Sequence, residues 1–127
     1  MIIVDIDDTV LRNGTQPIQK NIDYINSLPG KKVVVTGRTR NQRTETVAAL
    51  HKAGLHYSSL LMNPYTYKDS NKWKKEVAHR LSDATLAIDN DGGARAAYAS
   101  AGIKTMDPAT IPDVKKMWNL DPSPSIV

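Results

Sequence analysis

The amino-acid sequence predicts an α/β fold, in which a parallel sheet of about five strands carries helices on both faces. Short apolar runs alternate along the chain with segments whose apolar residues recur at helical spacing, and this alternation is typical of strands joined by crossover helices. Polar residues gather directly after three of the apolar runs. Because ligands of such sheets bind beyond the carboxyl ends of the strands, these clusters predict a functional site at one edge of the sheet.

The predicted strands are short runs rich in valine, isoleucine and leucine, at residues 1–4, 31–38, 58–62, 84–88 and 103–106. The first of them, from Met1 to Val4, contains no polar side chain. Such an unbroken apolar run predicts a strand that is buried on both faces, as the strands of parallel sheets are.

Helices are predicted between the strands, at residues 17–28, 40–53, 71–81 and 94–101, with a weaker one at 110–118. In the first, isoleucines recur at spacings of four and three residues, which predicts one apolar stripe along the helix. In the second, Val47, Leu50 and Ala53 are expected to face the core.

Length and composition predict one globular domain at residues 1–118 and a loose, proline-containing tail at 119–127. The chain has no cysteine, which excludes disulfides, zinc–thiolate sites and thiol nucleophiles. No apolar stretch approaches the ~20 residues of a membrane span, and the apolar start lacks the basic region of a signal peptide. We therefore expect a cytoplasmic protein without a membrane partner. The net charge of +4 favours a polyanionic partner such as nucleic acid, with a lysine-rich solvated surface as the alternative interpretation.

Three polar clusters sit at the carboxyl ends of the first, second and fourth predicted strands. They are Asp5 with Asp7, Asp8 and Thr9; Thr36 with Gly37 and Arg38; and Asp89 with Asn90 and Asp91. Burying carboxylates beside a core is costly unless a cation pairs with them, and a divalent metal ion is a usual partner. Each cluster alone is weak evidence, because a solvated strand end has the same composition. Their order along one parallel sheet makes the set specific.

The clusters resemble the motifs of the haloacid dehalogenase-like (HAD) phosphohydrolases. Residues 2–10 match the first motif and residues 33–38 the second, a lysine at the start of the helix before the fourth strand fits the third, and residues 86–91 loosely fit the fourth. The resemblance implies a three-layer, Rossmann-like domain with a magnesium-dependent phosphatase activity. The segments after the first two strands each hold one helix and leave no room for a cap domain, so we expect a site that is open to large substrates.

The resemblance also implies a role for each residue. Asp5 would be the nucleophile that forms an aspartyl-phosphate, and Asp7 the general acid and base. Thr36 would hydrogen-bond the phosphoryl group, and Lys74 would neutralise its charge. The implied metal ligands around Mg²⁺ are Asp5, Asp7, Asp89, Asn90 and Asp91. The implied substrate-binding residues are Asp8 and Thr9, through their backbone amides, together with Gly37 and Arg38.

Two positions of this assignment have alternatives. Several lysines lie near the start of the third predicted helix. Lys74 fits the family pattern best, because a tryptophan precedes it and a Lys-Glu-Val run follows it. Lys72 is the second candidate for the catalytic lysine. Many relatives carry two adjacent acids in the fourth motif, whereas Asn90 follows Asp89 here. Either Asp91 takes the place of the second acid, or the affinity for metal is reduced.

Within the superfamily, the chain is similar to the 3′-phosphatase domain of polynucleotide kinase–phosphatases, notably at residues 36–38, 61–62 and 86–89. This similarity implies that the substrate is a nucleic-acid 3′-phosphate end or a nucleotide. Asn63 stands where that family has an arginine, and a second expected arginine aligns near Gln16. The alternatives are a phosphatase of another small phosphorylated metabolite or of a phosphoprotein, and a degenerate HAD-fold protein that binds phosphate or metal without turnover.

Overall fold

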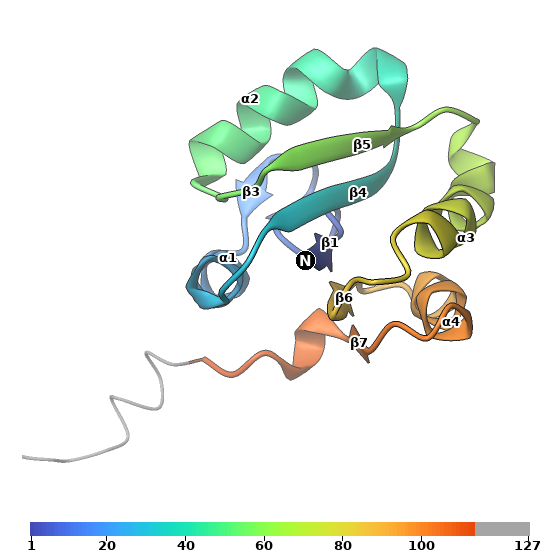
Figure 1. The fold of residues 1–127 in the computed structure, drawn as a ribbon. Coiled ribbons are helices and arrows are strands. Elements are labelled where there is room, and N and C mark those ends of the chain that lie inside the picture. Colours follow the sequence, from blue (N-terminus) through green and yellow to red (C-terminus); the bar gives the residue numbers. More distant parts are fainter. Residues whose placement is uncertain (114–127) are drawn as a thin grey trace, which may run out of the picture.

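The computed structural model describes residues 1–113, which form a five-stranded parallel sheet in the order β5-β4-β1-β6-β7 (Figure 1). The strands are β1 (Ile2–Val4), β4 (Lys32–Thr39), β5 (Ser59–Asn63), β6 (Leu86–Ile88) and β7 (Thr105–Met106). β1 pairs in parallel with β4 on one side and with β6 on the other. The apolar first run is therefore the central strand, and the predicted α/β class is confirmed.

Four helices cover the two faces of this sheet: α1 (Gln19–Ser27), α2 (Arg43–Ala53), α3 (Ser70–Arg80) and α4 (Gly92–Ser100). α1 and α2 lie on one face, and α3 and α4 lie on the other (Figure 1). Successive side chains of a strand point to opposite faces. Ile2 and Val4 accordingly join the core under α1 and α2, while Ile3 joins the core under α3 and α4.

The strand order reverses at β1, because β4 and β5 lie on one side of it while β6 and β7 lie on the other. Such a reversal opens a crevice beyond the carboxyl ends of the adjacent strands, and open α/β sheets bind their ligands there. The first and third polar clusters follow β1 and β6 directly, and the second lies at the carboxyl end of β4. The topology therefore brings all three to the same edge of the sheet.

A small antiparallel hairpin was not predicted from the sequence. It consists of β2 (Leu11–Arg12) and β3 (Gln16–Pro17), and follows the first polar cluster directly. Its turn contains Asn13 and Gly14 at φ values of 53° and 85°. An Asn-Gly pair is a strong sequence signal for such a turn, because both residues tolerate a positive φ. That dipeptide could have revealed the hairpin.

Two further expectations differ from the structure. Val47 was expected to face the core but is 38% exposed, and Thr46 is buried in its place with Leu50 and Ala53. The reason is that the buried stripe of α2 contains a hydroxyl, which an apolar pattern does not count. Of the predicted last helix, residues 110–113 are described; they contain only the last residue of the short 3₁₀ turn η3 (Pro108–Thr110) and no α-helix. The remainder of that prediction and the tail at 119–127 lie outside the described residues.

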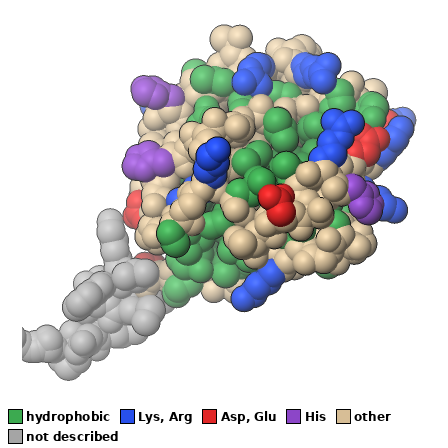
Figure 2. Space-filling model, in the orientation of Figure 1, with side chains coloured by type: hydrophobic (Ala, Val, Ile, Leu, Met, Phe, Trp, Pro, Cys, Tyr) green, Lys and Arg blue, Asp and Glu red, His purple; other side chains and the backbone are tan. Residues whose placement is uncertain are grey.

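Within residues 1–113, no helix is long and apolar enough to cross a membrane. All three histidines, His51, His56 and His79, are exposed. Histidine side chains lie at the margins of the face drawn in Figure 2, and the lysine and arginine side chains are spread over this face.

Candidate active site

The three clusters line one cleft at the carboxyl edge of the sheet, with a volume of about 260 Å³. We call it the carboxylate cleft. The segment after β1 contributes Asp5, Asp7 and Asp8, and the segment after β6 contributes Asn90 and Asp91. The first turns of α3 contribute Ser70, Asn71 and Lys74, and Gly37 and Tyr67 complete the lining.

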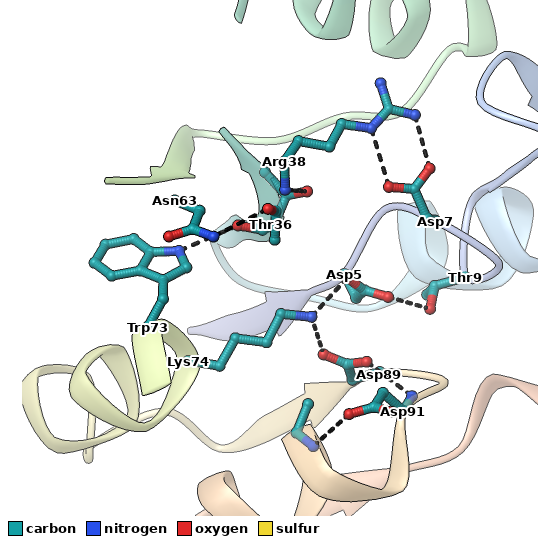
Figure 3. Close-up of polar contacts among 12 residues, drawn as sticks. Asp5, Asp7, Thr9, Thr36, Arg38, Asn63, Trp73, Lys74, Asp89 and Asp91 are labelled. Atoms are coloured by element: carbon teal, nitrogen blue, oxygen red, sulfur yellow. Dashed lines mark hydrogen bonds and ion pairs between the residues drawn. The ribbon is translucent and has the colours of Figure 1, made fainter. Parts of the chain in front are cut away.

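Asp5, Lys74 and Asp89 form a buried triad at the base of the cleft (Figure 3). The Nζ atom of Lys74 donates to Asp5 Oδ1 at 2.8 Å and to Asp89 Oδ2 at 2.6 Å. A charge that is removed from water needs such partners, because an unpaired buried ion costs several kcal/mol. One lysine thus compensates two carboxylates that are contributed by neighbouring strands.

The triad is electrostatically unbalanced, because two buried carboxylates share one cation. Burial raises the pKa of Asp5 to about 7, an effect that the charge of Lys74 opposes and the charge of Asp89 reinforces. Burial alone would lower the pKa of Lys74, but Asp5 and Asp89 together raise it above its usual value. Lys74 is therefore charged at neutral pH, whereas Asp5 is only partly ionised in the absence of a further cation.

Local packing explains why Lys74, and not Lys72, reaches the carboxylates. A Cβ atom on Gly37 would lie 2.7 Å from Ser70 Cβ, so the absence of a side chain lets the end of β4 approach the first turn of α3. One turn further along α3, the Lys74 side chain enters the cleft. Lys72 points elsewhere, and its Nζ lies 4.5 Å from the centre of the Tyr65 ring.

Thr9 and Asn21 hold Asp5 from the opposite side. Thr9 Oγ1 donates to Asp5 Oδ2 at 3.0 Å, and Asn21 Nδ2 of α1 donates to the carbonyl oxygen of Thr9 at 2.8 Å. Both side chains are buried. Asn21 was missed in the sequence because it was not among the polar clusters; an asparagine adjacent to the apolar stripe of a helix was the available signal.

Arg38 binds Asp7 through two parallel hydrogen bonds. Its Nε donates to Asp7 Oδ2 at 3.0 Å, and its Nη2 donates to Asp7 Oδ1 at 2.8 Å (Figure 3). Nη2 also donates to the carbonyl oxygen of Gly14, and Nη1 donates to Thr46 Oγ1. The hydrogen bond to Asp7 raises the pKa of Arg38 further. The sequence predicted that Arg38 binds substrate. In the structure its guanidinium hydrogen-bonds acceptors of the protein itself, and these bonds orient Asp7.

The backbone amides that were expected to bind phosphate have other partners. The N–H of Asp8 donates to the carbonyl oxygen of Leu11, and that of Thr9 to Ile6. Among residues 1–113, no hydrogen bond is found from the N–H groups of Ile6 and Asp7. The backbone N–H groups that are free to bind a ligand at this turn are thus those of Ile6 and Asp7, two residues before the predicted pair.

Thr36 does not line the cleft in this structure. Its side chain is completely buried, and its Oγ1 accepts a hydrogen bond from the N–H of Arg38 at 3.0 Å. Its carbonyl oxygen accepts from the indole nitrogen of Trp73 at 3.1 Å. The Thr36 hydroxyl retains its own hydrogen for donation, since Oγ1 acts here as an acceptor.

Asp91 and Asn90 have different environments. Asp91 Oδ2 accepts from the N–H of Ala94 and caps helix α4, and its own N–H donates to Asp89 Oδ1. Asn90 instead faces the first cluster: one terminal atom of its amide lies 2.9 Å from Asp5 Oδ2 and 3.0 Å from the main-chain oxygen of Asp7. Of the two residues, Asn90 is therefore the one directed at Asp5.

The donor set around Asn90 fits a hard divalent cation. With the amide nitrogen at this position, Asn90 donates two hydrogen bonds. With the amide turned over, three oxygen atoms converge from Asp5, Asp7 and Asn90, spaced by 2.9 and 3.0 Å. Ligands about 2.0–2.1 Å from an octahedral Mg²⁺ stand roughly 2.9 Å apart. Within residues 1–113, no three His, Cys, Asp or Glu side chains form a metal site by themselves, so an amide and a main-chain carbonyl would have to take part.

No protein-family model and no curated protein sequence matches this chain. In the structure described as "Structure of the Pnkp1/Rnl/Hen1 RNA repair complex", one chain is similar to this protein with a TM-score of 0.65 and 19% sequence identity. The similarity covers 84% of this chain but only 41% of the other, so this chain spans less than half the length of that protein. The two proteins share a fold.

Proposed function

We propose that this protein is a phosphomonoester hydrolase that acts through an aspartyl-phosphate on Asp5. The observation that carries the proposal is the buried Asp5 carboxylate, which lines an open cleft and is held between Lys74 and Thr9. A carboxylate that is fixed in this way has lost rotational freedom and water, and both changes favour nucleophilic attack. Asp7, two residues later, lines the same cleft and supplies a second carboxyl group for proton transfer.

In the first step, an oxygen of Asp5 attacks phosphorus, and the bond from phosphorus to the leaving oxygen breaks while Asp7 protonates that oxygen; for this step Asp7 must enter protonated, with one oxygen released from Arg38. In the second step, Asp7 takes a proton from a water molecule, which attacks the phosphorus and releases phosphate and Asp5. Lys74 neutralises the phosphoryl charge throughout. The amides of Ile6 and Asp7 would hydrogen-bond the phosphoryl oxygens.

A divalent cation fits this proposal because the cleft is acidic. Asp5, Asp7, Asp8 and Asp91 line it, with Lys74 as the one lining lysine or arginine among the described residues. A phosphate dianion would be repelled from such a surface. We propose Mg²⁺ as the cofactor, held by Asp5, the main-chain oxygen of Asp7 and Asn90. When bound, it would offset the repulsion and polarise the phosphoryl group.

We propose nucleic-acid ends or nucleotides as the substrate class. The described segment after β1 contains the small hairpin and α1, and the segment after β4 contains a 3₁₀ turn and α2; neither forms a cap over the cleft. An open cleft admits the end of a long polymer, and the net charge of +4 is compatible with a polyanion. The similarity to a chain from an RNA repair complex points in the same direction.

Hydrolysis of p-nitrophenyl phosphate with Mg²⁺ tests the activity. We expect turnover in the wild-type protein and none in Asp5→Asn, and a mass gain of one phosphoryl group on the acid-quenched wild-type protein. Asp83→Asn is the matched control, because Asp83 is exposed and precedes the amino end of β6. If the wild-type protein binds phosphate but shows no turnover with Mg²⁺, Mn²⁺ or Co²⁺, it is instead a phosphate-binding protein without phosphatase activity.

A further inference from the structure

A second cavity, with a volume of about 410 Å³, adjoins the carboxylate cleft. The two share Asp7 and Tyr67 as lining residues. The rest of the second cavity is lined by Arg38, by Gly14 and Thr15 of the hairpin turn, by Glu45 of α2 and by Gln42, which directly precedes α2. We call it the hairpin pocket. Its volume lies in the range of roughly 300–1,000 Å³ that is typical of small-molecule sites.

The place of Asp7 indicates which part of a substrate the hairpin pocket would hold. If Asp7 protonates the leaving oxygen, as in the proposed function, the phosphoryl group lies on the Asp5 side of Asp7. The organic group attached to that oxygen must then lie on the other side. The hairpin pocket begins at Asp7 and extends away from Asp5.

The charges that line the hairpin pocket disfavour an anionic occupant. Arg38 is its one lysine or arginine among the described residues, and both carboxylate oxygens of Asp7 already pair with that guanidinium. Glu45 is exposed and adds a further negative charge. A second phosphate in this pocket would therefore meet a carboxylate and a cation that is already paired.

The remaining groups suit an uncharged occupant with hydroxyls and a planar ring. Glu45 and the carbonyl of Gly14 can accept hydrogen bonds, and Thr15 can donate and accept them. Tyr67 is 66% exposed at the boundary between the two cavities. Other aromatic residues near this edge are engaged: the Tyr65 hydroxyl donates to Glu76, and the Trp73 indole donates to Thr36. An exposed ring of this kind can stack on a base.

We propose that the hairpin pocket binds the leaving group of the substrate, and that it selects an uncharged nucleoside over a leaving group that carries a second phosphate. This specificity rests on the proposed function, because it uses the role of Asp7. It narrows the proposed substrate class from nucleic-acid ends or nucleotides to nucleoside monophosphates, because the terminal nucleoside of a nucleic acid carries a second phosphate. Glu45 and Tyr67 are the specificity-determining residues.

The first test compares KM for adenosine 3′-monophosphate with KM for glycerol phosphate. Replacing Tyr67 with leucine should raise the ratio of these two KM values by about 5- to 150-fold, which is the range for loss of one base stack. Tyr65→Leu is the matched control, because Tyr65 lies outside both cavities, and it should leave the ratio within about twofold. Hydrolysis of glycerol phosphate with an unchanged ratio in Tyr67→Leu would overturn the pocket assignment and leave the proposed function standing.

The second test uses adenosine 3′,5′-bisphosphate. The wild-type protein should prefer the monophosphate in kcat/KM by about tenfold, and Glu45→Gln should reduce this preference, because it removes the like charge. A wild-type preference for the bisphosphate would overturn the proposal.

Adenosine binding, measured by calorimetry with the full chain and its Asp5→Asn variant, needs no turnover. Binding that Tyr67→Leu weakens supports the pocket even if phosphatase activity is absent, whereas no adenosine binding counts against the pocket.

Discussion

Arg38 holds both carboxylate oxygens of Asp7, with donor–acceptor distances of 3.0 and 2.8 Å. The two residues come from the ends of different strands, Arg38 from β4 and Asp7 from the segment after β1. The planar guanidinium fixes the plane of the carboxylate as well as its position. In the proposed reaction, Arg38 is therefore a positioning residue for the acid and base.

Arg38→Lys should lower kcat by about 10- to 100-fold with a smaller change in KM, because an ammonium group keeps the charge but loses the two-point geometry. Steady-state kinetics on an aryl phosphate measures this split. Arg40→Lys is the matched control, since Arg40 is exposed and does not line the cleft. An equal change in the two variants would refute the positioning role.

Lys74→Met should destabilise the protein by about 3–5 kcal/mol and abolish turnover. It leaves Asp5 and Asp89 buried without their common cation, and the loss of one partner from a buried ion pair has roughly this cost. Urea unfolding measures the change. Lys72→Met is the control: it removes only a surface contact with the Tyr65 ring, so we expect a loss of about 1 kcal/mol or less.

The raised pKa of Asp5 predicts how stability depends on pH in metal-free protein. The pKa of Asp5 is about 7 in the folded state against an ordinary value of 3.8 in the unfolded chain, so between these two pH values the folded state binds more protons than the unfolded state. This contribution to stability is complete below pH 4 and is lost as the pH rises through 7. Asp5→Asn should therefore reduce the loss of stability between pH 4 and pH 8, and it should raise Tm at pH 8 by about 3 °C or more.

Thermal unfolding with a chelator between pH 4 and 8 measures this dependence. Asp83→Asn should follow the wild-type curve, because Asp83 is exposed. A wild-type curve that rises steadily from pH 5 to pH 8, with no change in Asp5→Asn, would show that the Asp5 pKa is not raised.

Gly37→Ala should cost about 1–3 kcal/mol, since the new methyl group would lie 2.7 Å from Ser70 Cβ and would push α3 away from β4. Chemical unfolding measures the loss. The double variant Gly37→Ala with Ser70→Gly removes the Ser70 Cβ with which the new methyl group would clash, and it should be more stable than the sum of the two single changes predicts. Gly92→Ala is the control: its nearest atom would be the end of the Arg95 side chain at 3.7 Å, so little change is expected.

The sequence predicted the sheet and the three polar strand ends because those features are local. A buried apolar run that leads into polar residues can be recognised without knowing its neighbours: β1 and β6 lead into carboxylates, and the carboxyl end of β4 contains a threonine, a glycine and an arginine. The partners of those carboxylates depend on packing between segments far apart in the chain. Arg38 could be recognised as part of a motif, but its pairing with Asp7 depends on the register of β1 and β4. The support of Asp5 by Asn21 depends in the same way on how α1 packs beneath the first cluster.

Asn90→Asp should raise the affinity for Mg²⁺ by roughly tenfold, because a carboxylate would replace a neutral amide beside Asp5, and affinity for hard cations rises with ligand charge. Isothermal titration calorimetry measures this without requiring turnover. Asp91→Asn, at the next residue of the chain, is the matched control. Asparagine also caps helices well, so this variant should keep the cap on α4 and leave the Mg²⁺ affinity within about twofold. The reverse pattern, in which Asp91→Asn abolishes binding while Asn90→Asp has no effect, would assign the ligand to Asp91.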